Sequence, residues 1–257
     1  MKKQIVFGML LLVFTACKTT QEQSKAEDKE DAGIEASTSP YFKGNGNEPF
    51  WNIQISEAAI QFESLIPGFE KVIVPHVVPS KAMDANVKMY RVTTENADFQ
   101  IQIQQMKCQN SMSGEWLPYA VTVELKRNTE SDFTVLKGCG SYITDYRLHD
   151  IWVLEQLNGR KVELSDFNKE LPLIEINAAA NTFMGFAGCN QMNGRLFSEK
   201  NLLGFDHIVT TRMACGSMNK EGEFLKALQS VSSYKIKDNR LWLSNPSGLL
   251  IVFKKID

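Results

Sequence analysis

Hydrophobic and polar positions divide the chain into three stretches. A short apolar run, residues 5–14, follows two lysines at the start. Residues 18–40 contain almost no large apolar side chain and are rich in Lys, Glu, Asp, Gln, Ser and Thr. From residue 41 onward, short apolar runs alternate with turn residues. We therefore expect an apolar leader, a disordered tether and a folded region, because a segment without apolar side chains cannot bury enough surface to fold.

Residues 41–145 carry the pattern of β-strands. The run 99–105, FQIQIQQ, alternates between apolar and polar residues, which is the period of a strand with one buried face. Further β-rich runs occupy residues 50–55, 59–64, 71–78, 87–94 and 119–127. No segment here has a long helical period. We expect an antiparallel β-barrel or β-sandwich-like domain.

Residues 146–257 combine strand patterns with one helical pattern. In residues 219–231, Phe224, Leu225, Leu228 and Val231 fall on one face of a helix. Strand-like runs surround it at residues 171–176, 181–186, 195–198, 234–237, 240–244 and 248–255. Asp238-Asn239 lies between two of these runs, as in a two-residue hairpin turn.

The first 17 residues carry a targeting signal. Two lysines, the apolar run and Thr15-Ala16 before Cys17 resemble a bacterial lipoprotein signal ending in a lipobox. The run suits a signal of about 7–15 apolar residues and is short of the roughly 20 that span a bilayer. The resemblance implies that Cys17 becomes the lipidated N-terminus and that residues 18–40 tether the folded region. An ordinary cleaved signal with an incidental cysteine is the alternative.

Composition and net charge limit the classes of partner that the chain is expected to bind. The chain has 257 residues, 43% hydrophobic and 23% charged, an ordinary globular balance. Loss of Lys2 and Lys3 with the signal leaves 26 basic against 30 acidic residues, a net charge of −4. That acidity and the absence of a basic patch argue against a nucleic-acid partner. The length after the tether suits two domains of about 100 residues.

Four cysteines remain after Cys17, and their even number in an exported protein favours disulfides. They are Cys108, Cys139, Cys189 and Cys215. Three connectivities are possible. If there are two domains, the economical pairing is within each one, Cys108–Cys139 and Cys189–Cys215. A zinc site is disfavoured, because the chain has only three histidines and no CxxC motif.

Two groups of residues in the first region resemble a poorly characterised set of bacterial envelope domains. Residues 46–51, GNEPFW, match its G-x-E-P-F-W opening. Its cysteine-bounded loop is matched by Cys108, Met112-Ser113, Pro118-Tyr119 and Gly138-Cys139. The resemblance implies a β-barrel-like lipoprotein domain. Trp116, within this loop, is expected to cap the barrel, and contact with a ligand is the other interpretation.

The second region resembles the META domain, the HslJ-like family. The motifs are WVLEQLNG at 152–159, FAGCN at 186–190 and TRMAC at 211–215. The resemblance implies a compact α+β domain, mostly antiparallel with one main helix, linked to heat shock, envelope stress and drug tolerance. No enzymatic activity and no cofactor come with it. We expect Arg212 to pack its stem beneath the sheet and pair with a carboxylate; binding of an anionic ligand is the alternative.

No catalytic arrangement is evident. His76, His149 and His207 lie in no recognisable motif. Four methionines gather near Cys189 and Cys215, namely Met184, Met192, Met213 and Met218. Soft sulfur ligands suit copper(I), although methionines more often fill gaps in a core.

Together these features predict a non-enzymatic lipoprotein of the cell envelope, lipid-anchored in the outer membrane and facing the periplasm. We expect it to support envelope stress response or integrity by binding an envelope protein or a wall component. Its partners would be the membrane, through the lipid, and that unknown component, with no nucleic acid. A periplasmic module that binds a small ligand or copper, or acts as an inhibitor, is the alternative.

Overall fold

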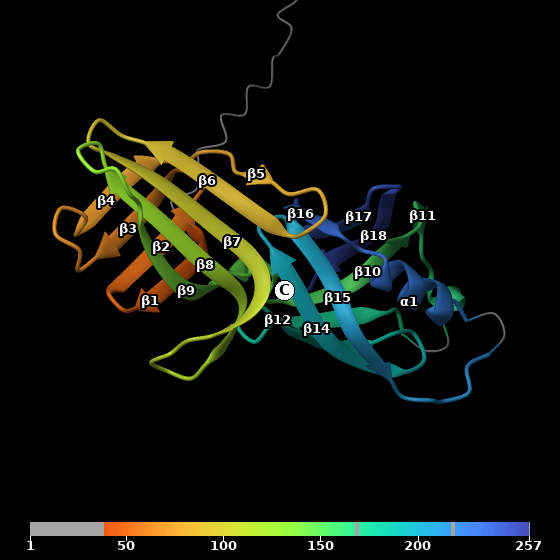
Figure 1. Cartoon of the computed structure of the whole chain (residues 1–257). Helices are drawn as coiled ribbons and strands as arrows, with labels where there is room; N and C mark the ends of the chain where they lie inside the picture. The colour runs from red at the N-terminus through yellow and green to blue at the C-terminus, as the bar shows by residue number, and fades with distance from the viewer. Residues whose placement is uncertain (1–38, 168–169, 217–218, 257) are drawn as a thin grey trace, which may run out of the picture. The chain divides into compact units, whose positions relative to one another are not determined.

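A computed structural model describes residues 39–167, 170–216 and 219–256. The predicted signal, Cys17 and almost all of the predicted tether lie outside the described residues. From Ser39 onward the chain forms one compact unit that contains two large antiparallel sheets (Figure 1). No helix in the described part of the chain is long and apolar enough to cross a membrane.

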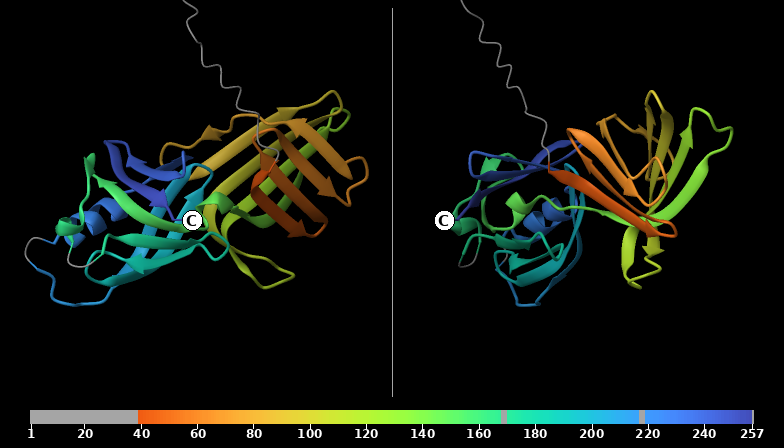
Figure 2. Two further views of the ribbon diagram at one scale, coloured as in Figure 1. Left: turned by 180° about the vertical axis from the view of Figure 1, so that it is seen from behind. Right: turned by 90° about the vertical axis from the view of Figure 1, so that its left-hand side faces the viewer.

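The first sheet has nine strands and remains open, with β4 at one edge and β5 at the other. Its order is β4-β3-β2-β1-β9-β8-β7-β6-β5, and it curls into a half-barrel (Figure 2). The strands are β1 Pro40–Asn47, β2 Phe50–Ser56, β3 Ala59–Ser64, β4 Lys71–Pro75, β5 Ser80–Lys81, β6 Val87–Thr93, β7 Ala97–Gln109, β8 Trp116–Arg127 and β9 Thr134–Tyr142.

Alternation places the core of this half-barrel on its concave side. In β7, Phe99, Ile101 and Ile103 are buried, and the glutamines between them are half-buried. The runs predicted at 50–55, 59–64, 87–94, 99–105 and 119–127 are confirmed as β2, β3, β6, β7 and β8. The run at 71–78 is shorter than predicted and ends at Pro75. The pattern missed β1 and β9, which are rich in glycine and polar residues.

The second sheet also has nine strands, in the order β11-β10-β12-β13-β14-β15-β16-β17-β18. Because β18 also pairs with β10, this sheet closes on itself. Its strands are β10 Ile151–Leu157, β11 Arg160–Lys161, β12 Leu173–Asn177, β13 Thr182–Phe186, β14 Gln191–Glu199, β15 Leu202–Thr210, β16 Ser233–Lys237, β17 Arg240–Asn245 and β18 Gly248–Lys255. Asp238 and Asn239 have φ of +54° and +55°, which confirms the predicted hairpin turn.

One α-helix, α1 Glu221–Gln229, packs against the closed sheet within the described residues. Phe224 and Leu228 are fully buried, and the Phe224 ring lies 6.1 Å from that of Phe253. The helix is two residues shorter at each end than predicted. Asn219 Oδ1 accepts a hydrogen bond from Glu221 N at 2.8 Å, just before the helix begins. The expected β-rich α+β fold with one main helix is confirmed.

Two hydrophobic cores lie within the compact unit. One draws on residues between Phe42 and Tyr142, and the other on residues between Leu148 and Phe253. A short 3-10 turn, η1 Tyr146–Leu148, joins the two sheets, and a second one, η2 Leu164–Asp166, follows β11. The first core ends at Tyr142 in the sequence, and the second begins at Leu148.

Candidate functional site

A buried tryptophan holds β1 and β9 close together at one end of the half-barrel. Trp51 has no exposed surface. A Cβ added at Gly46 would lie 2.3 Å from Trp51 Nε1, and one added at Gly138 would lie 2.0 Å from the Asn45 carbonyl oxygen. Both positions therefore require glycine for close packing. Gly46 and Trp51 come from the GNEPFW motif and Gly138 from the cysteine motif, so the structure joins two motifs that are far apart in sequence.

An asparagine network docks the β7–β8 hairpin loop onto β1. Asn110, only 7% exposed, donates from Nδ2 to Asn45 Oδ1 at 2.9 Å. Its Oδ1 accepts from the backbone N of Met112 and of Ser113, each at 3.0 Å. Asn47 Nδ2 donates to Ser111 Oγ at 2.9 Å. The loop is therefore held by defined hydrogen bonds.

The two disulfide pairs have the within-domain connectivity that was expected. Cys108 and Cys139 join β7 to β9 with a Cα–Cα distance of 5.6 Å. Cys189 and Cys215 join the FAGCN and TRMAC motifs at 6.0 Å. The first bridge fixes the same end of the half-barrel as the asparagine network.

A groove of about 460 Å³ lies beneath this hairpin. Its polar lining consists of amides and hydroxyls with a single charged side chain: Asn45, Asn47, Gln104, Gln109, Asn110, Ser111, Thr122 and Lys137. Asn and Gln side chains both donate and accept hydrogen bonds, and Ser and Thr hydroxyls do the same. The asparagine network uses part of this hydrogen-bonding capacity, and the rest gives the groove a neutral polar surface with little charge.

Trp116 stands beside this groove. It pairs with Gln109 across the β7–β8 ladder, so the two side chains lie on the same face. Its side chain is 56% exposed, and Lys107 Nζ lies 5.1 Å from the ring centroid. The expectation that Trp116 caps the barrel is wrong, because the register of β8 directs it outward. Its predicted contact with a ligand stays a prediction.

The exposure and pairing of Arg212 differ from the prediction. It lies in the exposed segment after β15 and forms no ion pair with any described carboxylate. The packed, paired arginine of the prediction is therefore wrong. Asn190 organises this segment instead, since its buried Oδ1 accepts from Met213 N at 2.7 Å and from Thr211 Oγ1 at 2.8 Å. Arg212 is thereby presented to solvent, far in sequence from the groove residues.

The sulfur atoms of the second domain form no open metal site among the residues that the structure describes. Cys189, Cys215 and Glu221 could together surround a cation, but the two sulfurs are bonded to each other. Met192 is buried in the core, whereas Met184 and Met213 are more than half exposed. Met218 lies outside the described residues.

The histidines lie away from the groove. His76 Nε2 is 2.9 Å from Tyr41 Oη, and burial, followed by the charge of Lys200, lowers the pKa of His76. His149 Nδ1 accepts a hydrogen bond from Ala178 N at 3.3 Å. His207 has a positive φ within β15.

Two solved structures resemble part of the chain. An NMR structure of a protein from Burkholderia xenovorans is 22% identical, covers 43% of this chain and 85% of its own, and has a TM-score of 0.34. A second NMR structure of a protein is 24% identical, with coverage of 42% and 90% and a TM-score of 0.34. Likeness at this level supports no functional conclusion.

Comparison with curated proteins found no match. A protein-family model, that of the META domain, does match the C-terminal part of the chain, residues 147–257. The match begins at residue 147, just before β10, and extends through the helix and the strand that closes the sheet. Residues 147–257 are therefore a META domain.

Proposed function

We propose that this protein is a non-enzymatic lipoprotein of the cell envelope that binds a glycan of the cell wall through the groove beneath the β7–β8 hairpin. Cys17 carries the lipid, which anchors the chain in the outer membrane facing the periplasm. Residues 18–40 tether the two domains to the membrane. The protein supports envelope integrity or the stress response by holding this wall component.

The observation that carries the proposal is the chemistry of the groove. A glycan presents many hydroxyl groups and little charge, and the amide and hydroxyl side chains of the groove complement such a surface. Trp116 adds a flat apolar face beside them, against which the face of a sugar ring can pack. The asparagine network and the Cys108–Cys139 bridge fix this arrangement before the ligand arrives, which lowers the entropy cost of binding.

The cysteine pairs support an exported protein. Disulfides persist in oxidising compartments such as the periplasm and are rare in the cytosol. Each domain carries one pair at bonding distance. Such bridges are stable in an extracytoplasmic chain, and they agree with the signal-like sequence before Cys17.

The binding site is tested by calorimetry with glycan strands from purified cell wall. The soluble chain from residue 18 onward contains the whole compact unit. We expect Trp116→Ala to weaken binding about tenfold, since tryptophan is enriched among the interface residues whose truncation costs more than about 1 kcal/mol. Tyr146→Ala is the control, because Tyr146 is also an exposed aromatic residue, 81% accessible, but lies in η1. Equal binding by wild type and Trp116→Ala would refute the site.

The anchor is tested separately in cells. Cys17→Ser should move the protein from the membrane fraction to the soluble periplasmic fraction. A variant that remains in the membrane would rule out the lipid at Cys17. Copper(I), titrated into the same soluble chain, distinguishes the small-ligand alternative, which predicts binding of copper where our proposal predicts none.

A further inference from the structure

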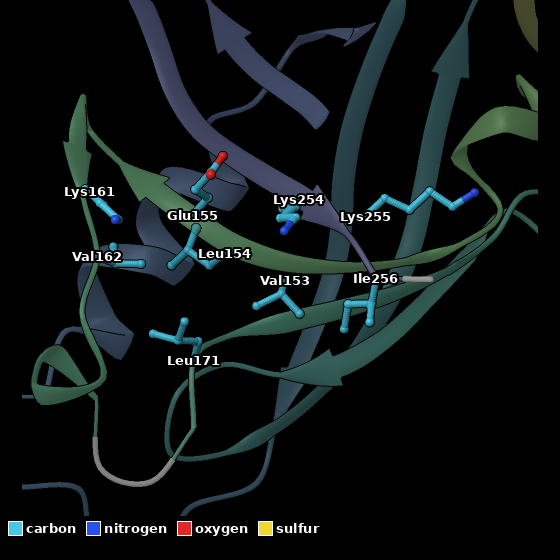
Figure 3. A pocket seen from close by; sticks show the side chains of 9 residues that line it. All are labelled: Val153, Leu154, Glu155, Lys161, Val162, Leu171, Lys254, Lys255 and Ile256. Carbon is cyan, nitrogen blue, oxygen red and sulfur yellow. The ribbon is translucent and has the colours of Figure 1, made fainter. Parts of the chain in front are cut away.

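A second cavity lies in the META domain, where β10 and β12 separate. These strands pair only as far as Val153 and Leu173, and Leu154 N makes a last bond to Pro172 O at 2.8 Å. Beyond that point β10 pairs with β11 instead. The gap opens a cavity of about 420 Å³ in the wall of the closed sheet (Figure 3).

The cavity is amphipathic. Figure 3 shows its apolar side chains gathered on one side and its charged side chains on the other. The apolar side consists of Val153, Leu154, Val162, Leu171 and Ile256. Leu154 and Val162 are buried, whereas Ile256 is 47% exposed and borders the opening. The cavity is therefore able to take up an apolar group that enters from solvent.

The charged side has a surplus of positive charge. Glu155 is the one carboxylate among the described residues that line the cavity, and Arg240 binds it through two hydrogen bonds of 2.5 and 2.9 Å. Lys255 Nζ pairs with Asp150 at 2.6 Å. Lys161 and Lys254 are exposed and form no ion pair with any carboxylate in the described ranges. These two ammonium groups are available for an anionic ligand.

We infer that this cavity binds a single-chain fatty carboxylate. The tail would lie against the apolar side, and the carboxylate would pair with Lys161 and Lys254 at the rim. A cavity of this size suits a small ligand and accommodates one acyl chain, whereas a phospholipid brings two. Each buried methylene should tighten binding about fourfold, so affinity should depend on tail length as well as on charge.

Calorimetry with dodecanoate, below its micelle concentration, tests the inference on the soluble chain from residue 18 onward. We expect dodecanoate to bind, octanoate to bind more weakly, and dodecyltrimethylammonium, with the same tail and opposite charge, not to bind at the cavity. Binding of both twelve-carbon probes with equal affinity would overturn the inference, because it would show that charge plays no part. Absence of dodecanoate binding would overturn it as well.

Variants locate the bound probe. Lys161→Glu combined with Lys254→Glu should weaken dodecanoate binding about tenfold or more, since it replaces attraction by repulsion at the rim. Lys235→Glu, an exposed charge reversal on β16, is the control and should bind like the wild type. Ile256→Gln should also weaken dodecanoate binding, because it removes part of the apolar side. Since Ile256 is half-exposed, the substitution should leave the fold intact. Unchanged affinity in both the double variant and Ile256→Gln would place the probe elsewhere and refute the site.

Discussion

The two sheets differ in how they complete their cores. The META sheet closes through the pairing of β10 with β18, and α1 adds Phe224 and Leu228 to the interior. The first sheet has no such pairing, and its two edge strands remain apart. Its core is rich in aromatic residues, and Glu199 and Lys200, at the β14–β15 turn of the META domain, contact residues of this sheet and its loops. An open sheet can therefore be completed by its neighbour in the chain.

Glu199 makes the main polar contact between the two sheets. It ends β14, is 2% exposed, and receives hydrogen bonds from Asn86 at 2.6 Å and from Lys88 at 2.7 Å. The hydroxyl of Tyr119 also donates to it. Burial, followed by the hydrogen bond to Glu199, raises the pKa of Tyr119, so this hydroxyl remains a donor at neutral pH. The closed sheet thus supplies a buried anion that the open sheet binds.

The largest loss of stability is expected when the carboxylate of Glu199 is removed. Glu199→Ala leaves Lys88, whose side chain is only 13% exposed, without its partner, and breaking a buried pair typically costs about 3–5 kcal/mol. Chemical denaturation at neutral pH measures the loss. Lys200→Ala is the control, because its ion pair with Glu57 is more than a third exposed on both sides and should contribute less than about 1 kcal/mol. Equal losses in the two variants would show that the buried contact stabilises the protein no more than the exposed ion pair does.

The disulfides should contribute equally to the two domains. Their sequence separations are 31 and 26 residues, so replacement of either pair by alanines should cost about 3.5 kcal/mol in the chain-entropy account. Thermal unfolding of the two double variants measures the effect. A much greater loss from Cys108–Cys139 would mean that the open sheet depends on its bridge more than the closed sheet does.

A third comparison uses two glycines with opposite surroundings. Gly46→Ala forces a Cβ against Trp51 and should destabilise the open sheet by about 1–3 kcal/mol. Gly222→Ala, in α1, meets nothing within 4 Å and should stabilise the protein by about 0.5–1 kcal/mol. Denaturant midpoints measure both changes. Destabilisation by Gly222→Ala would contradict the geometry of the helix.

The smallest effect on stability is expected from the titration of His76, whose ring lies against Tyr41 in the open sheet. The pKa of His76 is lowered in the folded protein, so the unfolded chain binds the proton more readily. Stability should therefore fall as the pH drops through the ordinary titration range of histidine. His76→Gln should reduce this dependence in stability curves measured at several pH values. If the pH dependence of stability is unchanged in His76→Gln, groups other than His76 cause it.

Strict alternation made part of the fold predictable. Buried and half-buried residues alternate in β7 as its sequence indicated, because that strand has one apolar face. The strand β1, PYFKGNGN, lacked this signal, since glycines occupy two buried positions, with Gly44 facing Ile53 and Val121 and Gly46 facing Trp51. The pairing of β10 with β18 joins distant segments that no local pattern connects.

The candidate site was only partly predictable. The motifs identified Trp51, Gly46 and the cysteines. They did not indicate that Asn110 would hydrogen-bond to Asn45 and so hold the hairpin against β1. Glu199 was missed because a glutamate before a turn is usually solvated, and its hydrogen-bond partners Asn86, Lys88 and Tyr119 lie 80 or more positions away in the sequence. Arg212 was predicted wrongly because the order of the TRMAC motif does not reveal that Asn190 holds the segment at the surface.

The central claim is tested most directly by NMR titration of the isotope-labelled soluble chain with glycan strands from purified cell wall. We predict shifts of the Trp116 indole N–H and of the side-chain amides of Asn45, Asn47 and Gln109, which line or adjoin the groove. The indole of Trp152, buried in the META core, should serve as the unperturbed reference. Spectra without shifts at Trp116 and the groove amides at saturating glycan would contradict the proposed function.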